Sequence, residues 1–176
     1  MDSRYENYLF VDGYNIINNW SELRQLSKLG LDIAREALEE KMIEYQAYMN
    51  VNVIIVYDAY AIRGSKEKIM NKFGLQIVFT KERETADRYI EKQLHNLGKE
   101  HRVKVATSDW VEQQVVLSRG GVRISARELY LEYKSMKDKI KRKTEKRSIQ
   151  KSTELLLEDL LDDEMKKQLE KMLKKD

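Results

Sequence analysis

The 176-residue chain contains neither cysteine nor proline. Without cysteine it can form no disulfide, hold no zinc through thiolates and use no cysteine nucleophile. Without proline, its turns must depend on glycine, asparagine and aspartate. Histidine is also scarce, with two residues in the whole chain, so no histidine cluster competes as a metal site. These absences leave carboxylate oxygens as the main metal-binding groups of the chain.

Long apolar runs are missing as well. No stretch of the sequence approaches the roughly 20 apolar residues that a membrane-spanning helix needs. The polar N-terminus lacks the apolar segment of a signal peptide. Apolar residues make up 41% of the chain and charged residues 36%, which suits a packed domain with a well-solvated surface. We therefore expect a cytoplasmic protein that has no membrane partner.

Charge is distributed unevenly along the chain. Residues 134–151 carry nine lysines and arginines against Asp138 and Glu145, a net charge of +7, whereas residues 152–176 carry a net charge of −3. A basic band of this density either binds phosphates or forms a solvated helix face. The sequence leaves both interpretations open.

Short apolar runs predict the strands of a sheet, and helical spacing fills the gaps between them. The predicted strands are residues 8–11, 51–57, 75–80, 103–107 and 122–125. The predicted helices are residues 32–49, 85–97 and 109–118, with Asp32 and Thr85 as candidate caps of the first two. Alternating strands and helices indicate an α/β fold with a mostly parallel central sheet and helices on both faces.

From Ser125 onward the pattern is helical, with an apolar stripe that includes Leu129 and Tyr133. We expect a break in this helical region near residues 148–152. It would separate a domain of residues 1–147, including the basic helix that begins at about residue 125, from a helical tail of residues 148–176.

Four aspartates follow the predicted strands in a consistent way. Asp12, Asp58 and Asp109 lie directly after a strand or within two residues of it, and Asp87 opens the helix after the third strand. Because the carboxyl ends of parallel strands meet at one edge of a sheet, these side chains should converge there. Gathered carboxylates need a compensating cation, and hard oxygen ligands suit Mg²⁺ or Mn²⁺. A single aspartate after a strand is more often a turn or cap residue, so the prediction depends on all four.

Cationic side chains near the same strand ends are candidates for binding phosphate. They are Arg63, Lys66, Lys81, Arg83 and Arg88. Within the basic band the candidates are Lys141, Arg142 and Lys143. The hydroxyls of Thr107 and Ser108 either bind phosphate or serve as strand-end and cap groups.

Four short motifs occur in a fixed order along the chain. They are VDGYNII at residues 11–17, VYDA at 56–59, ETADRYIE at 84–91 and ATSD at 106–109. In order and spacing they resemble the motifs of NYN-domain nucleases, a branch of the PIN-like superfamily. The resemblance is to the YacP-like subgroup, described as ribosome-associated messenger RNA endonucleases, and it covers about residues 7–145.

The resemblance implies a PIN-like, Rossmann-like three-layer fold and metal-dependent hydrolysis of RNA. Asp12 and Asp87 would be the central metal ligands, Asp109 would complete the metal site and Asp58 would support it. Asn15 would orient a carboxylate or contact the scissile phosphate. An activated water would attack the phosphodiester and leave a 5′-phosphate and a 3′-hydroxyl. The implied partners are messenger RNA and the ribosome, and a monomer is the favoured oligomeric state.

Other classes of protein fit the residues less well. A haloacid-dehalogenase phosphatase needs a second aspartate where Tyr14 stands, and a phosphoryl-receiver domain does not account for the DGYN signature. Nucleotide-binding domains need glycine-rich loops that the chain lacks. The remaining alternative is a non-catalytic RNA- or ribosome-binding module with the same fold. The basic band favours that alternative, whereas the presence of all four aspartates favours the enzyme.

Overall fold

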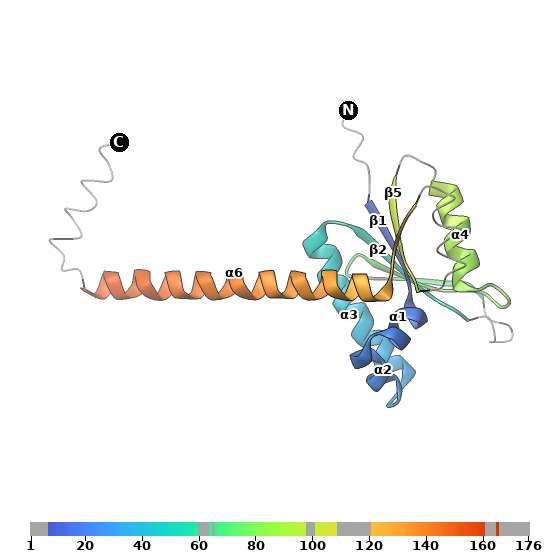
Figure 1. Ribbon diagram of the computed structural model, residues 1–176, viewed down its shortest axis with the longest axis horizontal. Helices are drawn as coiled ribbons and strands as arrows, with labels where there is room; N and C mark the ends of the chain where they lie inside the picture. The colour runs from blue at the N-terminus through green and yellow to red at the C-terminus, as the bar shows by residue number, and fades with distance from the viewer. Residues whose placement is uncertain are drawn as a thin grey trace. The chain divides into compact units, whose positions relative to one another are not determined.

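The computed structural model describes residues 7–59, 64, 66–97, 101–108, 121–160 and 165, with side chains along the last helix described as far as residue 153. Figure 1 shows the elements in chain order. They are β1 (Asn7–Asp12), α1 (Gly13–Asn19), α2 (Ser21–Ser27), α3 (Leu31–Met49), β2 (Asn52–Tyr57), β3 (Lys68–Lys72), β4 (Leu75–Phe79), α4 (Ala86–Leu97), β5 (Arg102–Ala106), β6 (Val122–Ile124) and α6 (Ala126–Leu160).

The described strands form one six-stranded sheet in the order β3-β4-β2-β1-β5-β6. Every neighbouring pair is parallel except β3 and β4, which form an antiparallel hairpin. The predicted α/β fold with a mostly parallel sheet is therefore confirmed. Strand β3 was not predicted, because its sequence KIMNK is almost entirely exposed and lacks the apolar run that marks the other strands.

Helices cover the sheet on both faces (Figure 1). On one face, Tyr89 and Ile90 of α4 pack in a buried cluster with Phe10, Val56 and Val78 of the strands. Residues that alternate with these along the strands point to the opposite face, where α1, α2 and α3 lie. Helix α3 buries a stripe at helical spacing against that face, made of Ala34, Leu38, Met42 and Tyr45.

The predicted helices 32–49 and 85–97 correspond to α3 and α4, whereas α1 and α2 were missed because each has only seven residues. Thr85 does cap α4, since its Oγ accepts a hydrogen bond from the Arg88 N–H at 3.3 Å. The predicted cap at Asp32 is wrong: Gly30 is the N-cap of α3, and Asp32 lies in the first turn. The predicted helix 109–118 lies outside the described residues.

Helix α6 runs through residues 148–152 without interruption, so the expected break there is wrong. The hydroxyls of Ser152 and the adjoining Thr153 donate to the carbonyls one turn back, so these residues remain compatible with a helix. The chain divides into two compact units at a point inside α6, residues 1–134 and 135–176. The domain boundary expected near residue 147 stays a prediction. No helix among the described residues is both long and apolar enough to cross a membrane.

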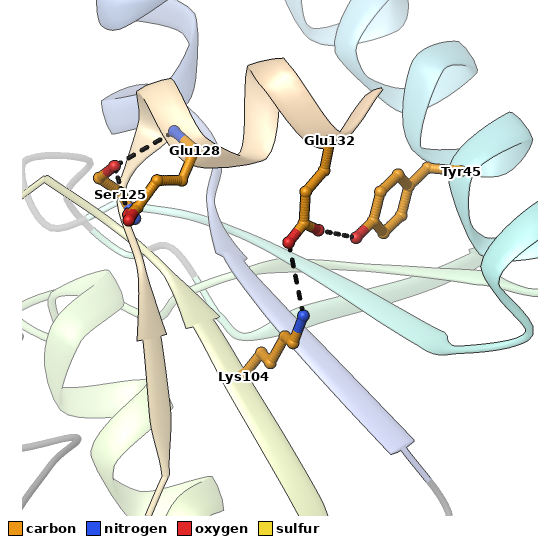
Figure 2. Close-up of polar contacts among 5 residues, drawn as sticks. All are labelled: Tyr45, Lys104, Ser125, Glu128 and Glu132. Carbon is orange, nitrogen blue, oxygen red and sulfur yellow. Dashed lines mark hydrogen bonds and ion pairs between the residues drawn. The ribbon is translucent and has the colours of Figure 1, made fainter. Parts of the chain in front are cut away.

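The start of α6 is set by a reciprocal cap. The Ser125 N–H and hydroxyl donate to Glu128 Oε2 at 2.7 and 2.6 Å, and the Glu128 N–H donates back to Ser125 Oγ at 3.2 Å (Figure 2). This is the capping-box arrangement, which satisfies backbone donors that a helix start otherwise leaves unpaired. The same hydrogen bonds lower the pKa of Glu128.

The first turns of α6 are also bound to elements far away in the sequence. The Trp20 indole N–H donates to the Ala126 carbonyl at 2.8 Å in a buried position. Figure 2 shows Glu132 of α6 between two partners: it accepts from the Tyr45 hydroxyl of α3 at 2.6 Å and lies 3.6 Å from Lys104 Nζ of β5. The first turns of α6, which belong to residues 1–134, are thereby joined to both the helical layer and the sheet.

We expect the Tyr45 hydrogen bond to give a pH-dependent stability. Burial first, and then the hydrogen bond and charge of Glu132, raise the pKa of Tyr45 above its ordinary value. A raised folded-state pKa means that the contribution is complete below the unfolded pKa of about 10 and is lost as the pH rises above it. Tyr45→Phe should lower the free energy of unfolding at neutral pH by about 1–2 kcal/mol and make it fall less steeply above about pH 10.

Urea unfolding at neutral pH and above about pH 10 measures both effects. Tyr48→Phe is the matched control, because Tyr48 lies on the same helix and is 47% exposed. Identical unfolding curves for the two variants would show that the Tyr45–Glu132 hydrogen bond does not stabilise the fold.

Candidate functional site

The order of the strands places a topological switch point at one edge of the sheet. From β1 the chain moves outward to β2 and β4 and then crosses to β5 on the other side of β1. Ligands of open parallel sheets bind at such a switch point, outside the carboxyl ends of the strands. Asp12 is the last residue of β1, and Thr107 and Ser108 follow β5. The residues at this switch point, between the ends of β1 and β5, are therefore those of the DGYN and TSD motifs.

Asp12 and Asn15 form the centre of the described site. Asp12 is the N-cap of α1, and its carboxylate accepts a hydrogen bond from the Asn15 N–H at 3.1 Å. The side-chain oxygen of Asn15 accepts from the Ser108 N–H at 3.0 Å, and the Asn19 amide lies 3.3 Å from the same oxygen. Asn15 thus holds the Asp12 carboxylate through its backbone and ties the end of β1 to the end of β5 through its side chain.

Ser108 extends this connection to α6. Its hydroxyl oxygen accepts from the N–H of Ala126, the first residue of α6, at 3.3 Å. Its neighbour Thr107 is fully buried, and the Thr107 N–H donates to the Ile124 carbonyl at 3.1 Å. The Ser108 hydroxyl thus bonds the start of α6, whereas the helix that it was expected to cap lies outside the described residues, and phosphate binding by these hydroxyls stays a prediction.

Gly13 allows α1 to lie close against the sheet. A Cβ atom at this position would lie 2.3 Å from Cε1 of Tyr57 and 3.0 Å from Cγ2 of Ile55. Tyr57 is fully buried and stacks on Phe79, with ring centroids 5.2 Å apart, so it has no room to move aside. A side chain at residue 13 would push the start of α1, and Asp12 with it, away from the strand ends.

Asp58 follows β2 in a loop that a buried threonine holds in place. The Thr80 hydroxyl accepts from the Ala59 N–H at 2.9 Å, and the Thr80 N–H donates to the Tyr57 carbonyl at 3.1 Å. Asp58 itself is half-buried. Thr80 was missed as a site residue because a threonine at the end of a strand is common, and only its full burial distinguishes it.

The segment before α4 carries the other acids of the edge. Asp87 is exposed in the first turn of α4, where a carboxylate also interacts favourably with the helix dipole. Glu84, in the loop before it, is 9% exposed, and its Oε2 has no hydrogen-bond partner among the described residues. Burial first, and then the nearby carboxylates of Glu67 and Glu84, raise the pKa of Tyr89. A buried carboxylate oxygen without a partner is the kind of group that a cation or water satisfies.

The donor set suits a hard cation in its chemistry, since it consists of carboxylate oxygens. Within the described segments, however, no three aspartate, glutamate or histidine side chains are grouped closely enough to hold one metal ion. Asp109, which was expected to complete the metal site, lies outside the described residues. The structure therefore brings Asp12, Asp58 and Asp87 to one edge of the sheet without completing a coordination sphere.

The predicted cationic residues fall into two groups. Lys66, Lys81, Arg83 and Arg88 are exposed in the loops and first helical turn around β3, β4 and α4, and Arg83 lies 3.9 Å from Glu82. Arg63 lies outside the described residues. Lys141, Arg142 and Lys143 are exposed on the part of α6 that belongs to residues 135–176.

These features define a class of protein: a Rossmann-like α/β domain with an aspartate at the switch point of its sheet. The family model of the YacP-like NYN domain matches residues 9–174. A Bacillus subtilis (strain 168) protein named Uncharacterized protein YacP is 41% identical over 138 residues, which cover 77% of this chain and 79% of the relative. The chain belongs to the YacP-like NYN domain family.

Solved structures agree with this assignment. A crystal structure of Rae1 (YacP) from Bacillus subtilis has a TM-score of 0.69 and 35% sequence identity, and the match covers 96% of this chain and 95% of that one. A single-residue mutant of the same protein gives a TM-score of 0.69 and 38% identity over 81% of this chain and 83% of that one. Membership of the family is consistent with a nuclease or another RNA-related role.

We expect Gly13→Ala to destabilise the protein because its Cβ would overlap the buried Tyr57 ring. Overpacking of this kind costs about 1–3 kcal/mol, which should lower the melting temperature by several degrees. Glu40→Ala is the control, because Glu40 is an exposed residue in the interior of α3, where alanine is a good helix former. Thermal unfolding of the two variants decides the matter: equal melting temperatures would show that α1 does not depend on this close approach.

Proposed function

We propose that this protein is a metal-dependent endoribonuclease whose active site is centred on Asp12. The observation that carries the proposal is the position of the Asp12 carboxylate. The carboxylate lies at the switch point of the sheet and accepts a hydrogen bond from the Asn15 N–H. The Asn15 side chain in turn accepts a hydrogen bond from Ser108, which follows β5. The family assignment to the YacP-like NYN domain supports a nuclease rather than another kind of protein with its site at this edge of the sheet.

In this proposal Asp12 and Asp87 are the central ligands of Mg²⁺ or Mn²⁺, Asp109 completes the site and Asp58 supports it. The bound cation would neutralise the carboxylates, activate water and stabilise the negative charge that develops on the phosphodiester. Asn15 keeps the Asp12 carboxylate oriented by its backbone N–H. Attack by water on phosphorus with the 3′ oxygen as the leaving group would break the P–O3′ bond and leave a 5′-phosphate and a 3′-hydroxyl, without a 2′-hydroxyl nucleophile.

Removing the carboxylate charge should abolish cleavage. Asp12→Asn and Asp87→Asn keep the side-chain size but lose the ligand charge, so RNA cleavage with Mg²⁺ or Mn²⁺ should fall at least about 100-fold. Asp32→Asn is the control, because Asp32 is an exposed acid in the first turn of another helix. The cleavage products are separated on a gel and their ends identified by the action of a 5′-phosphate-dependent exonuclease.

Cleavage at the wild-type rate by Asp12→Asn or Asp87→Asn would show that the metal-site assignment is wrong. Products that carry 5′-hydroxyl ends would instead show that the P–O5′ bond is broken, which contradicts the proposed departure of the 3′ oxygen.

We further propose that the substrate is messenger RNA on the ribosome, in the cytoplasm, and that the exposed basic part of α6 contacts RNA phosphates. Lys141, Arg142 and Lys143 are all exposed, and phosphate contacts give affinity that depends strongly on salt. Changing all three to glutamate should weaken binding to RNA or ribosomes at least about 10-fold in a pull-down or anisotropy assay.

The control for this change reverses three exposed cations elsewhere, Lys28, Lys92 and Arg102, and so gives the same change in net charge. Equal binding by the two variants would assign the α6 cations to solvent.

The second candidate function is a non-catalytic RNA- or ribosome-binding module, which the exposed basic surface of α6 favours. Cleavage and binding assays on the wild-type protein distinguish the two functions. Absence of cleavage on free RNA and on translating ribosomes, together with retained binding, would support the module.

A further inference from the structure

The guanidinium of Arg35 lies at the carboxyl edge of the sheet, close to the proposed active site. Its central carbon is 5.9 Å from the centroid of the Tyr57 ring and 5.5 Å from that of Phe79, and its Nη1 donates to the Tyr14 hydroxyl at 3.2 Å. Tyr57 and Phe79 are the last residues of β2 and β4. Tyr14 belongs to the same motif as Asp12, and Tyr57 directly precedes Asp58.

Most of the hydrogen-bonding capacity of Arg35 is unused within the described part of the chain. A guanidinium has five N–H donors, and the Tyr14 hydroxyl takes one of them. No described carboxylate lies within ion-pair distance of Arg35. Glu39, one turn further along α3, lies 3.4 Å from Lys72 instead. Arg35 is half-buried, and charged groups that leave water usually have an anionic partner.

The aromatic rings lie beside this guanidinium, whose central carbon is within cation–π distance of both Tyr57 and Phe79. Contact with the rings restricts the side chain before a ligand arrives, so less side-chain freedom is lost on binding. A planar, permanently charged group with paired donors matches the geometry of phosphate oxygens. The arrangement thus combines an unused set of donors, a positive charge and a position beside the aspartates.

A structural role alone accounts for only part of this arrangement. The contact with the two rings helps to hold α3 on the sheet, but an uncharged side chain of similar length would pack there without the cost of burying a charge. The Tyr14 hydroxyl is a neutral partner, so it does not compensate the charge.

We propose that Arg35 binds an internal phosphate of the RNA strand where the strand crosses the carboxyl edge of the sheet beside Asp12. This inference rests on the proposed function. Arg35 would act as a substrate-binding residue that positions the strand. Tyr14 would hold one donor of the guanidinium so that the others remain directed away from it.

Arg35→Met tests the proposal because it keeps an unbranched apolar stem against the rings and removes the charge. In an Asp12→Asn background, its dissociation constant for a short single-stranded RNA should rise about 10-fold. The plot of log affinity against log salt should become shallower by about 0.7, the loss of one phosphate contact. In the wild-type background KM should rise more than kcat falls. Arg35→Lys should recover part of the affinity, since it keeps the charge but not the planar fork.

Arg24→Met is the matched control, because Arg24 is an exposed arginine of α2 whose loss should leave binding and cleavage unchanged. Equal affinity, salt dependence and KM for Arg35→Met and Arg24→Met would overturn the proposal. So would a weaker affinity with an unchanged salt slope and a lowered melting temperature, which would assign Arg35 to packing.

Comparing RNA that has a 5′-hydroxyl with RNA that has a 5′-phosphate shows whether Arg35 binds an internal phosphate or the terminal one. An equal loss of affinity for both supports an internal phosphate, and a loss confined to the 5′-phosphorylated RNA overturns that assignment. If the wild-type protein neither binds nor cuts RNA, the proposed function fails and the assignment of Arg35 fails with it. If the wild-type protein cuts RNA, the proposed function stands whether or not the Arg35 variants are defective.

Discussion

The candidate site depends on the hydrogen bond between the Asn15 side chain and the Ser108 backbone. Strands β1 and β5 are neighbours in the sheet but are separated by most of the length of the domain in sequence. Beyond the last ladder hydrogen bonds, a separate contact is needed to keep their ends in register. Asn15 supplies it at 3.0 Å, and its own N–H meanwhile holds the Asp12 carboxylate at 3.1 Å. One residue therefore contacts both the Asp12 carboxylate and the segment that follows β5.

The surrounding residues make this arrangement possible through close packing on the α3 face. The missing side chain at Gly13 lets α1 start directly over Tyr57, and the Tyr57 ring supports both Phe79 and the guanidinium of Arg35. The polar residues of the candidate site and the aromatic residues Tyr57 and Phe79 thus lie at the same ends of the strands. Interior packing has little spare volume, so a change in the aromatic layer is expected to move the polar groups as well.

Local sequence patterns predicted the elements that bury continuous apolar runs or helical stripes. Four of the five predicted strands and helices α3 and α4 have such patterns, because each must cover one face of the core. The fifth, β6, was predicted although only Ile124 of it is buried. Strand β3 and the short helices α1 and α2 escaped prediction. The exposed residues of β3 show no alternation of apolar and polar side chains. The seven-residue helices are too short to show a helical repeat of apolar residues.

The site was predictable to a different degree at each position. The positions of Asp12, Asp58 and Asp87 after their strands followed from the parallel order of the strands, whereas their convergence into a metal site stays a prediction, since no three acids are grouped within the described residues. The contacts of Thr80 and Arg35 did not, because they join residues more than twenty positions apart through side chains of ordinary types. The expected break in α6 was wrong for a related reason: serine and threonine can bond the carbonyl one turn back and remain within a helix.

Two tyrosine–glutamate pairs connect α3 with the start of α6 in opposite directions. Tyr45 of α3 donates to Glu132 of α6, and Tyr133 of α6 donates to Glu44 of α3. Because both partners are adjacent in each helix, the two bonds form together in only one helical register. Inserting one residue between 128 and 132 would rotate Glu132 by about 100° relative to the helix start and break both pairs at once. The first turns of α6 should therefore tolerate substitutions on their exposed face but not a change in length.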